Sequence, residues 1–254
     1  MTLESVNAIV TGATGGIGQA IVSMLLANRA AKVGVLGRDQ EKVMAVIEEV
    51  GGHGFGDQTV PLVADITDPH ATEKAVDSFT NAAGPLQILV NNAGVVFDGA
   101  LVSFAGGKAA PYPMESWDAT LRTNLTGTFL CTQLAVAQMM AGATGGVVVN
   151  ISSTSRQGAA GQAAYSCTKG GIVSMTLSLA QELTPMGIRC VAVAPGLVEI
   201  GMGMSMSEGH RKRLLRRIPA GRMAHPDEVA HAVRFCIEND YFNGAVLDLH
   251  GGMQ

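Results

Sequence analysis

A glycine-rich segment near the N-terminus, residues 11–18, constrains the fold of this chain more than any other feature. It reads Thr-Gly-Ala-Thr-Gly-Gly-Ile-Gly, follows a short apolar run at 7–10 and precedes helically spaced apolar residues at 19–27. A strand, a glycine-rich turn and a helix in this order form a cradle for a pyrophosphate group, because backbone N–H groups and the positive helix end face it. The spacing is G-x-x-x-G-x-G and not the common G-x-G-x-x-G. A hairpin turn is the alternative, but it does not explain the helix that follows.

Apolar strand-like runs alternate with helical patterns along the whole chain. The predicted strands are 7–11, 32–36, 59–64, 86–91, 146–152, 188–194 and 245–249, and the predicted helices are 17–28, 39–50, 69–82, 115–141, 162–184, 206–217 and 226–238. This alternation favours an α/β fold in one domain over 1–254, with a seven-stranded, mostly parallel, doubly wound sheet covered by helices on both faces. Two stretches without periodicity predict substrate loops near 98–113 and 197–222.

Composition excludes several classes of function. The 254 residues are 47% hydrophobic and carry a net charge of −4, which gives no global attraction to nucleic acid or an anionic membrane surface. The apolar runs are too short to span a bilayer, and no targeting peptide is visible at the start of the chain. The four cysteines lack metal or C-x-x-C spacing, and we expect buried, reduced thiols in a cytoplasmic protein; they are Cys131, Cys167, Cys190 and Cys236.

Tyr165 and Lys169 are four residues apart within a predicted helix, so their side chains share one face. A free tyrosine has a pKa of about 10, too high for proton transfer near neutrality. A cation about 5 Å away, at an effective dielectric of about 20, stabilises the phenolate by roughly 3 kcal/mol. This equals about 2.4 pKa units, which would bring Tyr165 into the range of general acid/base catalysis. An ordinary amphipathic helix surface is the alternative.

Further motifs accompany this pair in a fixed order along the chain. They are Asp65, Asn91-Asn92-Ala93-Gly94, Asn124, Ile151-Ser152-Ser153, Pro195-Gly196 and Gly251-Gly252. With them the chain resembles a classical short-chain dehydrogenase/reductase over nearly its whole length. Its C-terminal half is similar to type II 3-hydroxyacyl-CoA dehydrogenases and to 3-oxoacyl-carrier-protein reductases. The resemblance implies a Rossmann-type fold, a homotetramer and hydride transfer between a nicotinamide and a carbonyl or secondary alcohol, with a 3-oxoacyl or 3-hydroxyacyl thioester (on acyl-CoA or acyl carrier protein) as the expected substrate.

The resemblance also implies roles for individual residues. Tyr165 would exchange a proton with the substrate oxygen, and Lys169 would lower its pKa and hold the nicotinamide ribose. Asn124 would hold a water that passes protons to Lys169, unless it only caps or kinks a helix. Asp65 would meet the adenine amine, unless it only caps the turn that follows. The implied cofactor-binding residues are Gly12, Thr14, Gly16, Ile17, Gly18, Arg38, Asp65, Ile66, Asn92, Ala93, Gly94, Tyr165, Lys169, Pro195, Gly196 and Val198.

A serine at the end of the fifth predicted strand would hydrogen-bond the substrate oxygen, and two serines compete for this role. Counting back thirteen residues from Tyr165 selects Ser152, whereas alignment of the strand selects Ser153 with a deletion in the following loop. We predict Ser153, because loops absorb deletions and a one-residue shift turns a strand side chain to the other face. Ile200 stands where the family often has a threonine that holds the nicotinamide carboxamide.

The residues after the second predicted strand bear on the choice of cofactor. The acid that would bind the ribose 2′-hydroxyl of NAD is replaced by Gly37, and Arg38 follows it. An arginine can hold a 2′-phosphate with two directed hydrogen bonds. We therefore favour NADP(H), with NAD(H) as the alternative. Alternatively, Arg38 has no cofactor role and is a solvated charge at the helix start, paired with Asp39 or Glu41.

Two other functions stay open at this point. A non-catalytic nucleotide-binding regulator can use the same fold, but it would not need the full catalytic set. A sugar or steroid alcohol dehydrogenase would share that set. Five basic residues at 211–217 (Arg211, Lys212, Arg213, Arg216, Arg217) would suit a phosphorylated acyl carrier. Three methionines (Met202, Met204, Met206) would suit an acyl chain.

Overall fold

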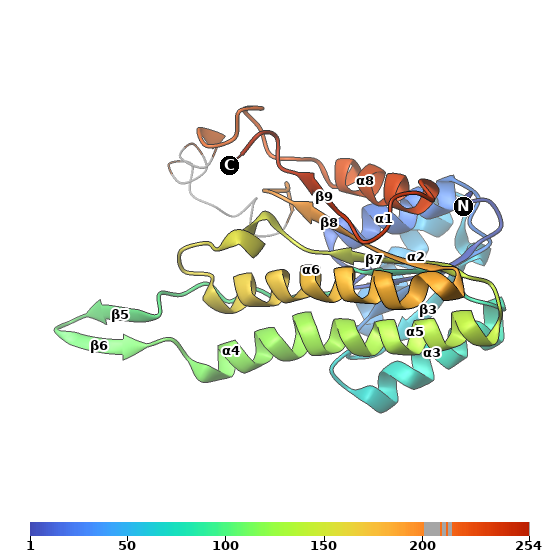
Figure 1. Cartoon of the computed structure of the whole chain (residues 1–254), viewed down its shortest axis with the longest axis horizontal. Coiled ribbons are helices and arrows are strands. Elements are labelled where there is room, and N and C mark those ends of the chain that lie inside the picture. The colour runs from blue at the N-terminus through green and yellow to red at the C-terminus, as the bar shows by residue number, and fades with distance from the viewer. Residues whose placement is uncertain (201–208, 210–211, 213–214, 254) are drawn as a thin grey trace.

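A seven-stranded parallel sheet forms the centre of the computed structural model, which describes residues 1–200, 209, 212 and 215–253. Within these residues the strand order is β3-β2-β1-β4-β7-β8-β9, and all six neighbouring pairs are parallel. The prediction of a doubly wound, mostly parallel sheet is confirmed (Figure 1). The strands are β1 Asn7–Thr11, β2 Lys32–Gly37, β3 Thr59–Val63, β4 Ile88–Asn91, β7 Gly146–Ile151, β8 Ile188–Pro195 and β9 Val246–Leu249.

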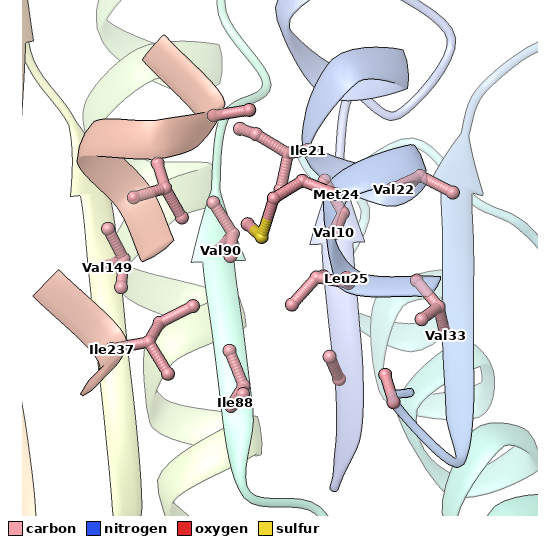
Figure 2. Packing of buried hydrophobic residues seen from close by; sticks show 14 of the residues in the cluster. Val10, Ile21, Val22, Met24, Leu25, Val33, Ile88, Val90, Val149 and Ile237 are labelled. Carbon is pink, nitrogen blue, oxygen red and sulfur yellow. The ribbon is translucent and has the colours of Figure 1, made fainter. Parts of the chain in front are cut away.

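Helices cover both faces of this sheet. They are α1 Gly16–Ala27, α2 Gln40–Gly52, α3 Pro69–Ala83, α4 Met114–Leu121, α5 Thr128–Ala141, α6 Ala163–Leu183 and α8 Pro226–Glu238. Residues of α1, α2 and α8 pack in one apolar cluster, and residues of α3, α5 and α6 pack in the other. Val10 of β1 belongs to the first cluster and Ile9 to the second, because successive strand side chains point to opposite faces. Figure 2 shows Val10, Val90 and Val149 meeting the helices of the first cluster.

The predicted helix 115–141 is divided in the structure. A π-helical segment, η2 Arg122–Gly127, lies between α4 and α5, and the backbone passes through all three without leaving the helical region. The predicted start of α3 is correct, since Asp68 accepts hydrogen bonds from His70 N and Ala71 N and Pro69 is its first residue. The predicted helix 206–217 lies mostly outside the described residues.

The lack of periodicity in the stretch 98–113 predicted an irregular loop, and this prediction is wrong for part of the stretch. It contains an antiparallel hairpin of β5 Val102–Ala105 and β6 Lys108–Pro111, which extends away from the sheet (Figure 1). Gly106 and Gly107 form its turn with φ of 60° and 76°, values that favour glycine and match the twist of paired strands. Every residue of both strands is exposed.

The cysteines differ from expectation at one position. Cys131, Cys190 and Cys236 are buried, and burial raises the pKa of each thiol to about 12. Cys167 is exposed, so the prediction of four buried thiols is wrong there; its place on the outer face of α6 could not be read from composition. In the described part of the chain, no group of three His, Cys, Asp or Glu side chains could hold a metal ion. No helix of those residues is long and apolar enough to cross a membrane.

Candidate active site

A cavity of about 460 Å³ lies at the carboxyl ends of the central strands, where ligands bind in open α/β sheets. It brings together nearly every residue that the sequence indicated. Its lining includes Gly12, Thr14, Gly16, Ile17, Arg38, Asp65, Ile66, Asn92, Ala93, Gly94, Ser153, Tyr165, Lys169, Pro195, Gly196 and Val198. Gly18 and Asn124 do not line it and support it from behind. The sequence analysis did not select Leu36, Ala64 and Thr123, which also line it; the first two stand at or just after a strand's carboxyl end, which is a usable signal.

The glycine-rich turn closes one end of the cavity. A Cβ atom at Gly18 would lie 2.3 Å from the Gly12 carbonyl oxygen, so this close helix-to-turn packing requires glycine. Gly12 has φ of 60°, and a Cβ there would lie 2.7 Å from Ala93 Cα. The helix α1 begins at Gly16 without a side-chain cap, so its first N–H groups face the cavity. These features make the anion-binding cradle that the sequence predicted.

Hydrogen bonds join this turn to the end of β4. The Asn92 side-chain amide donates to the carbonyl oxygens of Thr11 and Gly12, at 3.1 and 3.0 Å. The Thr11 hydroxyl accepts from the backbone N–H groups of Asn92 and Ala93, both at 3.1 Å. Residues 92–94 are therefore held against the cradle as one wall of the cavity.

Arg38 and Asp65 lie together at the adjoining end. Their nearest charged atoms, Arg38 Nη1 and Asp65 Oδ2, are 4.0 Å apart, and both side chains are exposed. Arg38 thus faces Asp65 and neither of the two acids considered from the sequence. Asp65 Oδ1 accepts from the backbone and hydroxyl of Thr67, at 2.9 and 2.8 Å, so it caps the turn and also lines the cavity. A Cβ at Gly37 would lie 3.0 Å from Thr14 Cγ2, which leaves little room for a larger residue.

Tyr165 and Lys169 lie one turn apart on α6, with Lys169 Nζ 5.5 Å from the centroid of the tyrosine ring. The ammonium is buried and donates to the carbonyl oxygen of Ile151 at 2.6 Å. Burial lowers the pKa of Lys169 to about 8. Burial raises the pKa of Tyr165, a side-chain hydrogen bond with Ser153 lowers it, and the charge of Asp98 raises it.

The lowered Tyr165 pKa expected from the Lys169 charge does not follow for the chain alone. The expectation counted the attraction of one cation and left out desolvation, which disfavours the charged form of both groups. Burial is the largest cause of the pKa shift of both groups, and it disfavours the phenolate of Tyr165 as well as the ammonium of Lys169.

The two candidate serines have separate contacts. Ser153 lines the same cavity as Tyr165 and lowers the pKa of that tyrosine through its side chain, and its Oγ accepts from the Ser155 N–H at 3.1 Å. Ser152 is buried, and its hydroxyl donates to the carbonyl oxygen of Lys169 at 2.9 Å. Geometry therefore brings Ser153 to the tyrosine and uses Ser152 to join the end of β7 to α6.

Asn124 lies in the π-helical segment and is fully buried. Its side chain accepts from Val95 N–H at 2.7 Å and donates to Val95 O at 2.8 Å. A Cβ at Gly94 would be 3.3 Å from Asn124 Oδ1 and 3.7 Å from Lys169 Nζ, so glycine lets these groups approach. Asn124 therefore lies in a helix irregularity, as one alternative held, and it also lies near Lys169, as the other held. The π segments of helices are frequent at functional sites.

Fold and cavity together are those of a dinucleotide-binding protein whose cavity is lined by a serine, a tyrosine and a lysine. Residues 6–211 match the short chain dehydrogenase family, and the chain belongs to it. It is 37% identical over 254 residues to (2S)-[(R)-hydroxy(phenyl)methyl]succinyl-CoA dehydrogenase subunit BbsD of Thauera aromatica, covering 99% of this chain and 98% of that protein. It is 36% identical to 3-oxoacyl-[acyl-carrier-protein] reductase FabG of Aquifex aeolicus (99% and 98% covered) and 34% identical to FabG of Vibrio cholerae (100% and 99%).

The protein is therefore an NAD(P)-dependent oxidoreductase that acts on CH–OH and C=O groups. The residues present fit a nicotinamide dinucleotide, because the uncapped start of α1 offers N–H groups to its pyrophosphate and the missing Cβ atoms of the turn leave the approach open. Ile200 lines the cavity and packs on Gly16, where a Cβ would come within 2.5 Å of Ile200 Cγ2. An apolar side chain thus lies where a hydrogen-bonding threonine was expected from the family.

Proposed function

We propose that this enzyme interconverts a 3-oxoacyl thioester and its 3-hydroxyacyl form, with NADP(H) as the favoured cofactor. The observation that carries the chemistry is that Ser153, Tyr165 and the buried Lys169 line one cavity, with the Lys169 ammonium 5.5 Å from the centroid of the tyrosine ring. The thioester is supported by the similar proteins, one of which acts on a CoA thioester and two of which are acyl-carrier-protein reductases by name.

Each catalytic residue has a task that its position supports. Bound nicotinamide supplies or accepts the hydride. The Tyr165 hydroxyl gives a proton to the substrate oxygen or takes one from it, and the Ser153 hydroxyl orients that oxygen. Lys169 would hold the ribose hydroxyls of the cofactor. The positive charge of an oxidised nicotinamide ring would favour the Tyr165 phenolate, which burial alone disfavours.

A water held beside Asn124 would pass protons between bulk solvent and Lys169. The side-chain amide of Asn124 is engaged with Val95 and Thr168, so such a water would bind the backbone carbonyl. That oxygen also accepts from the Thr128 hydroxyl at 2.8 Å, so the water would share it with this hydroxyl.

A homotetramer in the cytoplasm completes the proposal. Large apolar side chains stand exposed on α5 and α6, including Phe129, Met140 and Leu177 with exposures of 50%, 51% and 41%. A further copy of the chain would cover them, and light scattering that gave a monomer at micromolar concentration would rule this out. The buried, unpaired thiols of Cys131, Cys190 and Cys236 agree with a reducing compartment.

An absorbance assay of NADPH oxidation tests the function. Acetoacetyl-CoA, a set of keto-sugars and a set of steroid ketones are offered separately, and we expect turnover with acetoacetyl-CoA. Tyr165→Phe should abolish turnover and leave NADPH affinity nearly unchanged, because it removes only the transferable proton. Activity confined to sugars or steroids would keep the mechanism and remove the thioester, whereas an active Tyr165→Phe enzyme would remove the mechanism.

A further inference from the structure

The root of the exposed hairpin is tied to the turn that carries Ser153. That turn is a short 3₁₀ segment, η3 Thr154–Gln157, which follows Ser153 directly. Gln162, at the start of α6, stands between the two regions. Its Nε2 donates to Asp98 Oδ1 at 2.9 Å, and its Oε1 accepts from the Ser155 hydroxyl at 2.8 Å.

These contacts continue to the reacting atoms. The Ser155 N–H donates to Ser153 Oγ at 3.1 Å, and Ser153 is hydrogen-bonded to Tyr165. One lone pair of Ser153 Oγ is used by Ser155, and the hydroxyl hydrogen remains free to turn to the tyrosine oxygen. The chain of contacts therefore runs Asp98, Gln162, Ser155, Ser153, Tyr165.

Every link in this chain fixes the next one. The Gln162 amide must turn its donor to the carboxylate and its acceptor to the hydroxyl, so its orientation is determined. The hairpin root is itself held, since Gly99 N–H donates to Gly161 O at 2.8 Å and the Tyr112 hydroxyl donates to Phe97 O at 2.7 Å. Asp98 thus has a fixed anchor on the body of the enzyme.

We infer that Gln162 is a positioning residue, which joins Asp98 at the hairpin root to Ser155 and so sets the Ser153 hydroxyl against Tyr165. This rests on the proposed function, because positioning matters only if Ser153 and Tyr165 act on a substrate oxygen. It makes the hairpin a structural part of the active site, although its strands lie outside the cavity lining.

The charged surroundings of Tyr165 give a second readout. Asp98 is the carboxylate whose charge raises the pKa of Tyr165, and α4, which packs against α6, adds no such effect through its own acids. Arg156 of η3 is bonded to Asp248 at 2.7 and 3.1 Å. Besides Asp98, the charged residues of α6 and of the elements packed against it are Lys169 and Glu182 of α6, Glu115 and Asp118 of α4, Arg122 of η2, Arg156 of η3 and Arg189 of β8.

Gln162→Leu and the control Gln157→Leu test the inference by steady-state kinetics. Gln157 is exposed in the same turn, and its side chain makes no hydrogen bond to the part of the chain that the structure describes. Gln162→Leu should lower kcat about tenfold, the effect of a misplaced hydrogen bond worth about 1.4 kcal/mol, with NADPH affinity unchanged. Gln157→Leu should behave as wild type, and equal kcat values for the two variants would overturn the inference.

Exchanging the carboxylate of Asp98 and the amide of Gln162 between the two positions tests whether a lower kcat comes from lost positioning or from general damage to the structure. Gln162→Glu alone places two carboxylates together and should lose activity. Adding Asp98→Asn lets the new amide donate to the new carboxylate, which still accepts from Ser155, and should restore kcat to within about threefold of wild type. A double variant no better than Gln162→Glu would contradict the positioning role, and this pair remains decisive if Gln162→Leu does not fold.

A measurement without substrate separates this inference from the proposed function. If acetoacetyl-CoA is inert and another ketone is reduced, the kinetics are repeated with that ketone. If none is reduced, NMR of ¹³Cζ-labelled tyrosine follows the titration of Tyr165, assigned with Tyr165→Phe among three tyrosines. Asp98→Asn should lower the Tyr165 pKa, and should lower it less in the Gln162→Leu background. Equal shifts in both backgrounds would show that Gln162 does not hold the carboxylate.

Discussion

The ammonium of Lys169 donates to the backbone carbonyl of Ile151 at 2.6 Å, which fixes α6 to the last residue of β7. A second hydrogen bond joins the same two elements one residue later, where the Ser152 hydroxyl donates to the Lys169 carbonyl at 2.9 Å. A side chain of α6 thus donates to the backbone at the end of β7, and the serine just after β7 donates to the backbone of α6. The position of Ser153 follows, because it is the next residue along the strand end.

The two neighbouring serines should respond differently to truncation. Ser153→Ala should lower kcat roughly 100-fold, the loss typical of a donor to a reacting oxygen. Ser152→Ala should keep kcat within a few-fold and lower the free energy of unfolding by about 1 kcal/mol, because it loses one buried hydrogen bond. Steady-state assays and urea unfolding of both variants check this, and a larger kcat loss in Ser152→Ala would reverse the assignment.

Burial of Lys169 should make stability depend on pH above neutrality. The folded pKa of Lys169 is about 8 against the ordinary lysine value of 10.5, so between these values the unfolded chain binds more protons. The free energy of unfolding should therefore rise with pH across this window, by up to about 3 kcal/mol from this group. Lys169→Met removes the effect. Urea unfolding at about pH 7.5 and about pH 10 should show wild type gaining on this variant, and a constant difference would contradict a buried, weakly basic amine.

The parallel sheet was predictable because each central strand is a short apolar run buried on both faces, whereas the order of its strands was not predicted. The residues at strand ends could be placed for the same reason, since parallel strands end at one edge. The π segment at Asn124 was not predictable, because the apolar spacing of 115–141 continues through it. The hairpin could have been predicted, since the Gly-Gly pair at 106–107 joins the runs 101–105 and 108–111 and is a recognised turn signal.

The electrostatics of the site could not be derived from spacing. The four-residue spacing from Tyr165 to Lys169 places the groups near each other but does not say how deeply they are buried, and burial is the largest cause of both pKa shifts. The choice between the adjacent serines likewise needed the geometry of the strand end.

Close packing at Gly18 should make it the least replaceable glycine of the turn. In Gly18→Ala the new methyl would meet the Gly12 carbonyl oxygen at 2.3 Å and Ala13 Cα at 2.7 Å, and backbone atoms cannot rotate away. We expect a loss of about 1–3 kcal/mol in unfolding free energy and weaker NADPH binding. Gly52→Ala is the control, since its methyl meets no atom within 4 Å. Thermal unfolding should separate the two, and equal stability would show that the turn moves freely.

Arg38 should determine the preference between the two cofactors. Its guanidinium lies 4.0 Å from Asp65, close enough to be held near the cavity but too exposed for a strong ion pair. A 2′-phosphate would compete for it with two charge-assisted hydrogen bonds. Arg38→Ala should weaken NADPH binding by about 1.5–3 kcal/mol and leave NADH nearly unchanged. Arg29→Ala, at another exposed arginine that pairs with Glu4, is the control. Fluorescence titration of both cofactors decides, and equal weakening, or tighter NADH binding by wild type, would assign the enzyme to NAD(H).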